Sequence, residues 1–362
     1  MLLFTAALLA VCLILLGTLL VWSHPGTPRP FVDAAGLRLP GSISEKIRVV
    51  INGAEQGMFI TGRDRTNPVL LYLHGGMPEY FLTEHYPTGL EALFTVVWWE
   101  QRGSGLSYRA DASPDTVTVE QLIADTIALA RYLRERFHTE KVYLMAHSGG
   151  TFIGIQAAQR APELFHAYLG VAQMSHQLAS ERRAYEYMLE QFRARKNGRM
   201  VRRLEAAPVT MTGGTPPAYL ALRDEAMHQL GIGTTRDMTS VMTGVFLRSL
   251  RSREYTLSEK LNLWRGKARA GVSAQWATML ATDLKETVPE LDIPVYFFSG
   301  VHDYTCSYVE ARSYFEQLRA PRKRFYSFEH SAHSPMFEEP ERMQQILRDD
   351  VLAGGQRIAE VR

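Results

Sequence analysis

Short, unbroken apolar runs recur along the chain, and each ends in a turn of glycine or polar residues. The clearest are Val69 to Leu73, Phe94 to Trp99, Val142 to Met145 and Val295 to Phe298. An unbroken run of this length is typical of a strand covered on both faces, as in a parallel sheet. Weaker runs near Tyr168 to Ala172 and at Arg324 to Phe328 extend the pattern.

A different pattern precedes these runs. Glu45 to Ile51 and Gln56 to Thr61 alternate apolar with polar residues on either side of Asn52-Gly53, and together they predict an antiparallel hairpin. Helical spacing appears after Thr118 to Gln121, a capping-box sequence, and again from Thr151 to about Arg160. Strands that alternate with helices predict an α/β fold with a mostly parallel, doubly wound sheet.

The strand signal disappears between Ser175 and about Pro289. Helical spacing there covers Ser180 to Lys196, Pro217 to Leu230, Thr239 to Ser249, Leu257 to Lys267 and Gln275 to Leu284. We interpret residues 175–289 as a helical cap inserted between two strands of a core formed by residues 45–174 and 290–362. Residues 25–44, which begin with Pro25, Pro28 and Pro30, are interpreted as a linker.

The first residues form the longest apolar run of the chain. Leu2 to Trp22 contains no charged residue, and as a helix it would span ~30 Å. We interpret residues 1–24 as a transmembrane helix, either a membrane anchor or an uncleaved signal, and favour the anchor. The predicted protein is therefore bound to the membrane by one span. Only Arg29 and Arg38 follow closely, so its side of the membrane stays open.

Composition excludes some classes of protein. The formal net charge is +2 over 362 residues and no Lys/Arg block occurs, which argues against nucleic acid as a partner. The two cysteines are Cys12 and Cys306, and Cys12 lies within the apolar run. No disulfide is therefore expected within the folded part.

The segment Lys141 to Gly154 suggests chemistry. An apolar strand is followed by Ala146-His147-Ser148-Gly149-Gly150 and then by a helix, close to the G-x-S-x-G pattern. A serine on such a sharp turn is exposed, and the next backbone N–H points into the same space. Ser148 is therefore the candidate nucleophile, and Gly149 a candidate oxyanion donor.

A serine hydroxyl needs a base, and the base needs a group that holds it. Asp303 follows the strand Val295 to Phe298, and His333 follows the last predicted strand. The order Ser148, Asp303, His333 is the order expected for this fold. His302 and His330 are rival bases, but a base must reach the serine from another loop, so we favour His333.

The second oxyanion donor is expected in the loop after an earlier strand. Leu73 to Pro78, with the sequence LHGGMP, places glycines where the backbone must approach a substrate carbonyl. We assign Gly76 or Met77 as the donor that acts with Gly149. His74 is interpreted as a brace for this loop rather than as a proton carrier.

Taken together, these motifs resemble the α/β-hydrolase superfamily. HGGMP at 74–78, WEQRGSGLS at 99–107, AHSGG at 146–150, GVHD at 300–303 and HSAHSP at 330–335 resemble its proline iminopeptidase-like branch, which carries HGGPG and DQRGSG. The resemblance covers roughly Lys46 to Leu347. It implies a Ser-Asp-His triad, a helical cap over the site, and no metal or organic cofactor.

The chain departs from that branch at several positions. Met77 replaces a proline, Glu79 follows where glycine is frequent, Glu100 replaces aspartate, and Ala146 and Gly149 replace the glycine and tryptophan around the serine. Aminopeptidases of the branch hold the substrate's amino terminus with cap carboxylates. Candidates here are Glu181, Glu186 and Glu190, although Glu186 and Glu190 at i,i+4 fit a solvated helix face.

We therefore predict a serine hydrolase that cleaves an ester or amide of a small acyl substrate or short peptide. A proline iminopeptidase-like aminopeptidase and an acyltransferase on the same triad are the alternatives. A non-catalytic binding module is least favoured, because all three triad residues are present. Arg102 is interpreted as structural rather than as a ligand for a substrate carboxylate.

Overall fold

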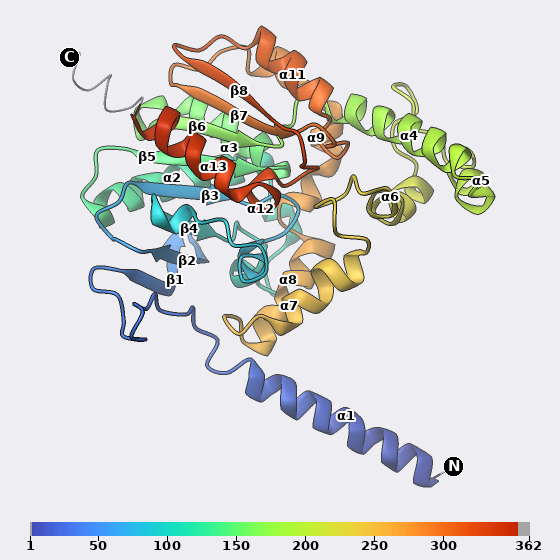
Figure 1. The fold of residues 1–362 in the computed structure, drawn as a ribbon, viewed down its shortest axis with the longest axis horizontal. Coiled ribbons are helices and arrows are strands. Elements are labelled where there is room, and N and C mark those ends of the chain that lie inside the picture. Colours follow the sequence, from blue (N-terminus) through green and yellow to red (C-terminus); the bar gives the residue numbers. More distant parts are fainter. Residues whose placement is uncertain (1, 354–362) are drawn as a thin grey trace.

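The computed structural model describes residues 2–353, and its centre is an eight-stranded sheet (Figure 1). The strand order is β1-β2-β4-β3-β5-β6-β7-β8. The strands are β1 Ile43–Ile51, β2 Ala54–Gly62, β3 Val69–Leu73, β4 Thr95–Trp99, β5 Val142–His147, β6 Phe165–Val171, β7 Val295–Gly300 and β8 Lys323–Phe328. From β4 to β8 neighbouring strands are parallel, whereas β1 and β2 pair antiparallel and β2 pairs antiparallel with β4. The predicted hairpin and mostly parallel sheet are confirmed.

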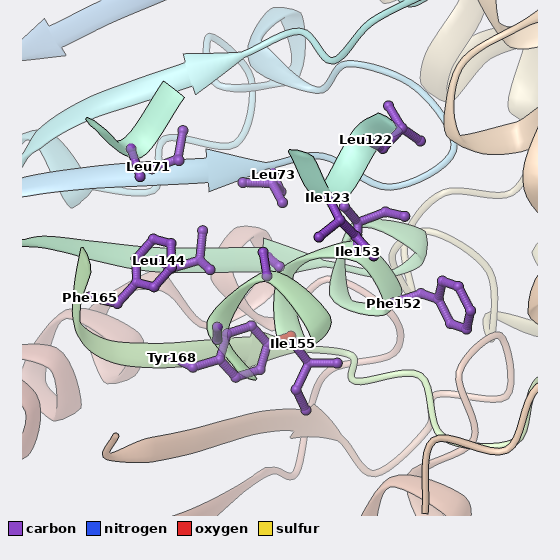
Figure 2. Packing of buried hydrophobic residues seen from close by; sticks show 14 of the residues in the cluster. Leu71, Leu73, Leu122, Ile123, Leu144, Phe152, Ile153, Ile155, Phe165 and Tyr168 are labelled. Carbon is purple, nitrogen blue, oxygen red and sulfur yellow. The ribbon is translucent and has the colours of Figure 1, made fainter. Parts of the chain in front are cut away.

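Apolar side chains fill both faces of this sheet. Along β3, Leu71 and Leu73 belong to one buried cluster, while Leu70 and Tyr72 belong to the other. The first cluster is completed by helices that follow β4 and β5, as Figure 2 shows for Leu122, Ile123, Phe152 and Ile153 packed over the strands. Because helices cover both faces of the sheet, successive side chains of a central strand are all buried, and this explains the unbroken apolar runs.

Helices of the α/β part flank this sheet. They are α2 Val119–Phe137, α3 Gly149–Arg160, α11 Tyr308–Gln317, α12 Pro335–Glu338 and α13 Pro340–Ile346. The predicted cap of α2 is present, because the Thr118 side chain accepts a hydrogen bond from the Gln121 backbone N–H at 3.1 Å.

The segment between β6 and β7 is helical and gathers on one side of the sheet (Figure 1). It contains α4 Gln177–Ala194, α5 Gly198–Glu205, α6 Pro217–Leu230, α7 Leu247–Arg251, α8 Leu257–Arg269, α9 Trp276–Ala281 and α10 Leu284–Thr287. We call residues 175–289 the cap. Helices α4, α5 and α6 share a buried cluster of their own. The helix expected from Gln275 to Leu284 is divided, because the Asp283 side chain caps a new helix at Lys285 N.

The N-terminal helix α1 Leu2–Trp22 extends away from the sheet (Figure 1). Among the described residues, no helix combines the length and the apolar character that crossing a bilayer requires. The predicted transmembrane helix and the membrane-anchored location are therefore wrong. The prediction relied on the length of the run, on its apolar residues and on the absence of charge, but Thr5, Gly17 and Thr18 interrupt the apolar residues.

The last turn of α1 also contacts the cap directly. Trp22 Nε1 donates to the Arg251 backbone oxygen at 2.5 Å, and Lys260 Nζ donates to Ser23 Oγ at 2.7 Å. Met1 of the predicted anchor and residues 354–362 of the predicted core lie outside the described residues.

Candidate active site

Ser148 occupies the sharp turn between β5 and α3. Its backbone has φ 54° and ψ −128°, a region that residues other than glycine rarely adopt. The turn fits against the loop after β3, because a Cβ on Gly75 would come within 2.7 Å of Ser148 Cβ. The strain therefore holds the serine side chain at the end of the strand, beside the HGGMP loop.

Asp303 and His333 come together at the ends of the next strands of the sheet. His333 Nδ1 lies 3.0 Å from Asp303 Oδ2, and both side chains are buried. The other oxygen, Oδ1, accepts from the backbone N–H groups of Thr305 at 2.8 Å and Cys306 at 2.9 Å. This fixes the carboxylate, which in turn orients the imidazole. Within residues 2–353 no hydrogen bond joins Ser148 to His333.

The HGGMP loop is held from two directions. His74 Nε2 accepts from the Gln101 backbone N–H at 3.1 Å, so Nδ1 carries the proton and donates to the Gly75 oxygen at 2.9 Å. Burial lowers the pKa of His74 to about 4, which agrees with this neutral tautomer. From the cap, Ser273 Oγ donates to the Gly76 oxygen at 2.6 Å.

These two bonds orient the peptide N–H groups of the loop. In a trans peptide the N–H points opposite to the preceding carbonyl. Fixing the carbonyls of Gly75 and Gly76 therefore also fixes the N–H groups of Gly76 and Met77. The predicted brace role of His74 agrees with this geometry.

One pocket of about 420 Å³ connects these parts. Ser148, His333 and the three candidate oxyanion residues Gly76, Met77 and Gly149 all line it. Its apolar wall includes Phe81, Leu82, Met174, Met227, Val241, Val245, Val272, Trp276 and Met279, and its polar wall includes Gln177, Arg223, Asp224, Lys267 and Thr305. The wall combines residues of the core with residues of the cap.

Comparison with known proteins identifies the family. The family model described as "Serine aminopeptidase, S33" matches residues 65–340. Probable aminopeptidase YbaC of Bacillus subtilis is 32% identical over 306 residues, which cover 83% of this chain and 93% of that protein. The chain belongs to the serine aminopeptidase S33 family of α/β-hydrolases.

Solved structures agree on the fold. Proline iminopeptidase of Mycobacterium smegmatis superposes with a TM-score of 0.64 at 17% identity, over 87% of this chain and all of that one (100%). A proline iminopeptidase-related protein from Thermus thermophilus has a TM-score of 0.53 at 20% identity, over 84% of this chain and 98% of that one. The resemblance to the α/β-hydrolase superfamily is confirmed, and the protein is a serine hydrolase of this superfamily.

The rival residues lie away from the pocket of this S33 family member. His302 and His330 do not line it, and His330 is exposed. Arg102 donates to Asp125 from Nε at 2.6 Å and from Nη2 at 3.0 Å, which supports the structural interpretation. Cys306 does line the pocket, and burial raises the pKa of its thiol well above the usual value.

The cap carboxylates named from the sequence are not open to the pocket. Glu181 is fully buried and accepts from Arg223 through both oxygens at 2.7 Å. Glu186 and Glu190 are exposed and do not line the pocket, as expected of a solvated face. Among the described residues of the cap, the carboxylate that lines the pocket is Asp224, next to Arg223 on α6; Glu79 lines it from the core.

Sequence reasoning missed Asp224, Ser273 and the role of Glu79. Asp224 lies within helix α6, and Ser273 lies in a short turn, so neither carries a local signature. Glu79 was visible as a departure from the branch, and its position beside HGGMP was the available signal. In the described part of the chain, no group of three His, Cys, Asp or Glu side chains is arranged to hold a metal ion.

Proposed function

We propose that this hydrolase cleaves an amide or ester bond next to a free amino group, with Ser148 as nucleophile, His333 as base and Asp303 as its orienting acid. The observation that carries the proposal is the placement of Ser148, on its strained turn, in the same pocket as the His333 ring that Asp303 holds.

The chemistry follows from these positions. Ser148 Oγ attacks the substrate carbonyl carbon while His333 Nε2 takes its proton. The resulting oxyanion accepts hydrogen bonds from the N–H of Gly149 and from the HGGMP loop. His333 then gives the proton to the leaving amine or alcohol, which leaves an acyl group on Ser148. Water, deprotonated by His333, attacks this ester, and the acid product and free Ser148 are released.

The cap supplies a place for the amino group. Arg223 donates to both oxygens of Glu181 but only to Oδ1 of Asp224, from Nη1 at 2.9 Å, so among the described residues Asp224 Oδ2 accepts no hydrogen bond. The Asp224 side chain is 52% exposed, and although the surrounding cap partly desolvates it, Arg223, Lys267 and His228 lower its pKa overall. Asp224 is therefore a carboxylate at neutral pH. The similar Bacillus subtilis protein is named a probable aminopeptidase, and that name supports this choice of substrate.

The first test is Ser148→Ala. We expect turnover of a p-nitrophenyl acyl ester to fall by roughly 10⁴-fold or more, because the nucleophile is lost. The folded protein should also lose labelling by a fluorophosphonate probe. Full residual activity in Ser148→Ala would sink the assignment.

Substrate pairs test the amine preference. Prolyl and alanyl arylamides are compared with the same compounds acetylated on nitrogen, and Asp224→Asn is compared with wild type. We expect acetylation to raise KM for the wild type and to matter much less for the variant, because Asp224 no longer offers a charge. An equal KM for the free and the acetylated arylamides in the wild type would show that the enzyme does not recognise the amino group.

A further inference from the structure

A second buried histidine lies beside the proposed base. His147 precedes Ser148 and is 1% exposed. Its ring and that of His333 have centroids 4.8 Å apart with an interplanar angle of 44°. His147 Nδ1 lies 2.7 Å from Glu79 Oε1, and Nε2 lies 2.9 Å from the backbone oxygen of His333.

These partners determine how many protons the ring carries. A backbone oxygen only accepts, so His147 Nε2 must donate to it. Glu79 Oε2 already accepts from Tyr72 OH at 2.5 Å, which favours the ionised carboxyl and leaves Oε1 as an acceptor for Nδ1. Nδ1 therefore also donates, and His147 is an imidazolium paired with a carboxylate.

Burial opposes both charges, but the interaction between them is stronger. Burial disfavours the imidazolium, yet the Glu79 carboxylate raises the pKa of His147 overall. Burial likewise disfavours the carboxylate, yet His147 and Tyr72 lower the pKa of Glu79. Both directions agree with an ion pair.

We infer that Glu79 and His147 form a buried ion pair that positions His333, holding its backbone by one hydrogen bond and placing a fixed positive charge beside its ring. This inference rests on the function proposed above, in which His333 is the base. Glu79 belongs to the loop after β3, His147 to the end of β5, and His333 to the loop after β8. The pair therefore ties together the three loops that would supply oxyanion donor, nucleophile and base.

The charge has a consequence for the reaction. A neighbouring cation disfavours a second proton on the His333 ring, so His333 remains an acceptor at lower pH. The titratable groups that face this pair from the surrounding elements are Tyr72, His74 and Asp303. Asp303 acts in the opposite direction, because its carboxylate favours the imidazolium of His333.

Two variants test the inference through the pH dependence of kcat/KM for a small ester. His147→Gln keeps an N–H where Nε2 lies but carries no charge, and Glu79→Gln removes the counter-ion that keeps His147 protonated. In both, we expect the midpoint of the acid limb to rise by about one pH unit, the usual size of the effect of one nearby charge. Glu100→Gln is the matched control, because it alters a buried carboxyl group that makes no hydrogen bond to His147, and it should leave the midpoint in place.

An unchanged acid limb in both folded variants would overturn the inference. Ser148→Ala in the same assay separates a failure of this inference from a failure of the proposed function. If Ser148→Ala is inactive and the midpoint does not move, only the positioning role fails. If Ser148→Ala remains active, the proposed function fails.

A measurement on the wild-type protein covers the case of variants that do not fold. With ¹⁵N-labelled histidine, we expect protons on both ring nitrogens of His147 at about pH 7, since both face acceptors. A His147 ring with one unprotonated nitrogen at that pH would contradict the ion pair.

Discussion

Single residues explain how an unusual nucleophile turn is accommodated. Ala146 carries a methyl group where the related pattern has glycine. A Cβ added to Gly154 would come within 2.9 Å of that methyl group, so the missing side chain at Gly154 leaves the space that Ala146 fills. A small residue is still required between β5 and α3, and here that residue is Gly154 in α3 rather than the residue at position 146.

The same scale gives a prediction for the oxyanion loop. Gly75 lies against Ser148, so the Gly75–Gly76 peptide is nearest the serine, and the N–H of Gly76 is the favoured donor. Gly76→Pro removes this N–H and should lower kcat by roughly 10²- to 10³-fold.

Met77→Pro is the matched control, because it deletes the next N–H of the same loop. We expect its kcat to stay within about tenfold of wild type, less than the loss of a true oxyanion donor. Steady-state kinetics on a small ester, with a melting curve for each variant, make the comparison. A larger loss in Met77→Pro would assign the donor to Met77 instead.

Most of the sheet and the positions of Ser148, Asp303 and His333 could be predicted from sequence, because buried strands and strained turns have local patterns. Asp224 could not, since its carboxylate reaches the pocket only through the packing of α6 in the cap. Glu79 pairs with His147 across 68 positions of sequence, and no periodicity reports such a contact. The membrane prediction, made from the uncharged apolar run and its length, was wrong, because no described helix is both long enough and apolar enough to cross a bilayer.

At the scale of elements, the loop after β4 is held by one buried acid. Glu100 accepts from the Leu106 backbone N–H at 2.5 Å and from Tyr255 OH at 2.5 Å. Tyr255 lies in the segment just before α8, so the acid also joins the core to the cap. Burial raises the pKa of Glu100 to about 8.

This raised pKa predicts how stability varies with pH. Between about pH 4.5 and about pH 8 the folded state keeps the Glu100 proton and the unfolded state releases it, so stability falls as pH rises. Glu100→Gln removes this term. Its free energy of unfolding should therefore gain on wild type across that window, by at most about 1.4 kcal/mol per pH unit, and its melting temperature should rise relative to wild type.

Melting curves at a series of pH values check this prediction. The melting temperature of Glu100→Gln is compared with that of wild type at each pH, since other groups titrate equally in both proteins. A difference that stays constant with pH, or shrinks, would contradict it.

At the scale of the whole molecule, ion pairs fasten the cap to the core at two places. Glu259 of the cap forms salt bridges with Lys46 at 2.8 Å and with Arg48 at 2.9 Å, both from β1. On the other side, Glu310 of α11 receives Arg183 of the cap at 2.7 Å. Between them, the turn before α9 covers the HGGMP loop, where Ser273 holds the Gly76 oxygen.

Ser273→Ala tests whether Ser273 supports the oxyanion loop through this hydrogen bond or only forms part of the pocket wall. It removes one hydrogen bond, so we expect kcat to fall about three- to tenfold with KM nearly unchanged. Ser273→Thr keeps the hydroxyl and should recover most of the loss. A rise in KM with unchanged kcat would show that Ser273 serves binding alone.

The hydrogen bond between Ser273 and Gly76 also implies that the enzyme selects its substrates by size. A substrate too bulky for the pocket would keep the cap raised and separate the two residues, so the oxyanion loop would lose one of its two supports while the substrate is bound. Such a molecule would occupy the enzyme and still be turned over slowly. Selectivity would then appear in the rate of acylation more than in affinity, and large ligands would act as inhibitors.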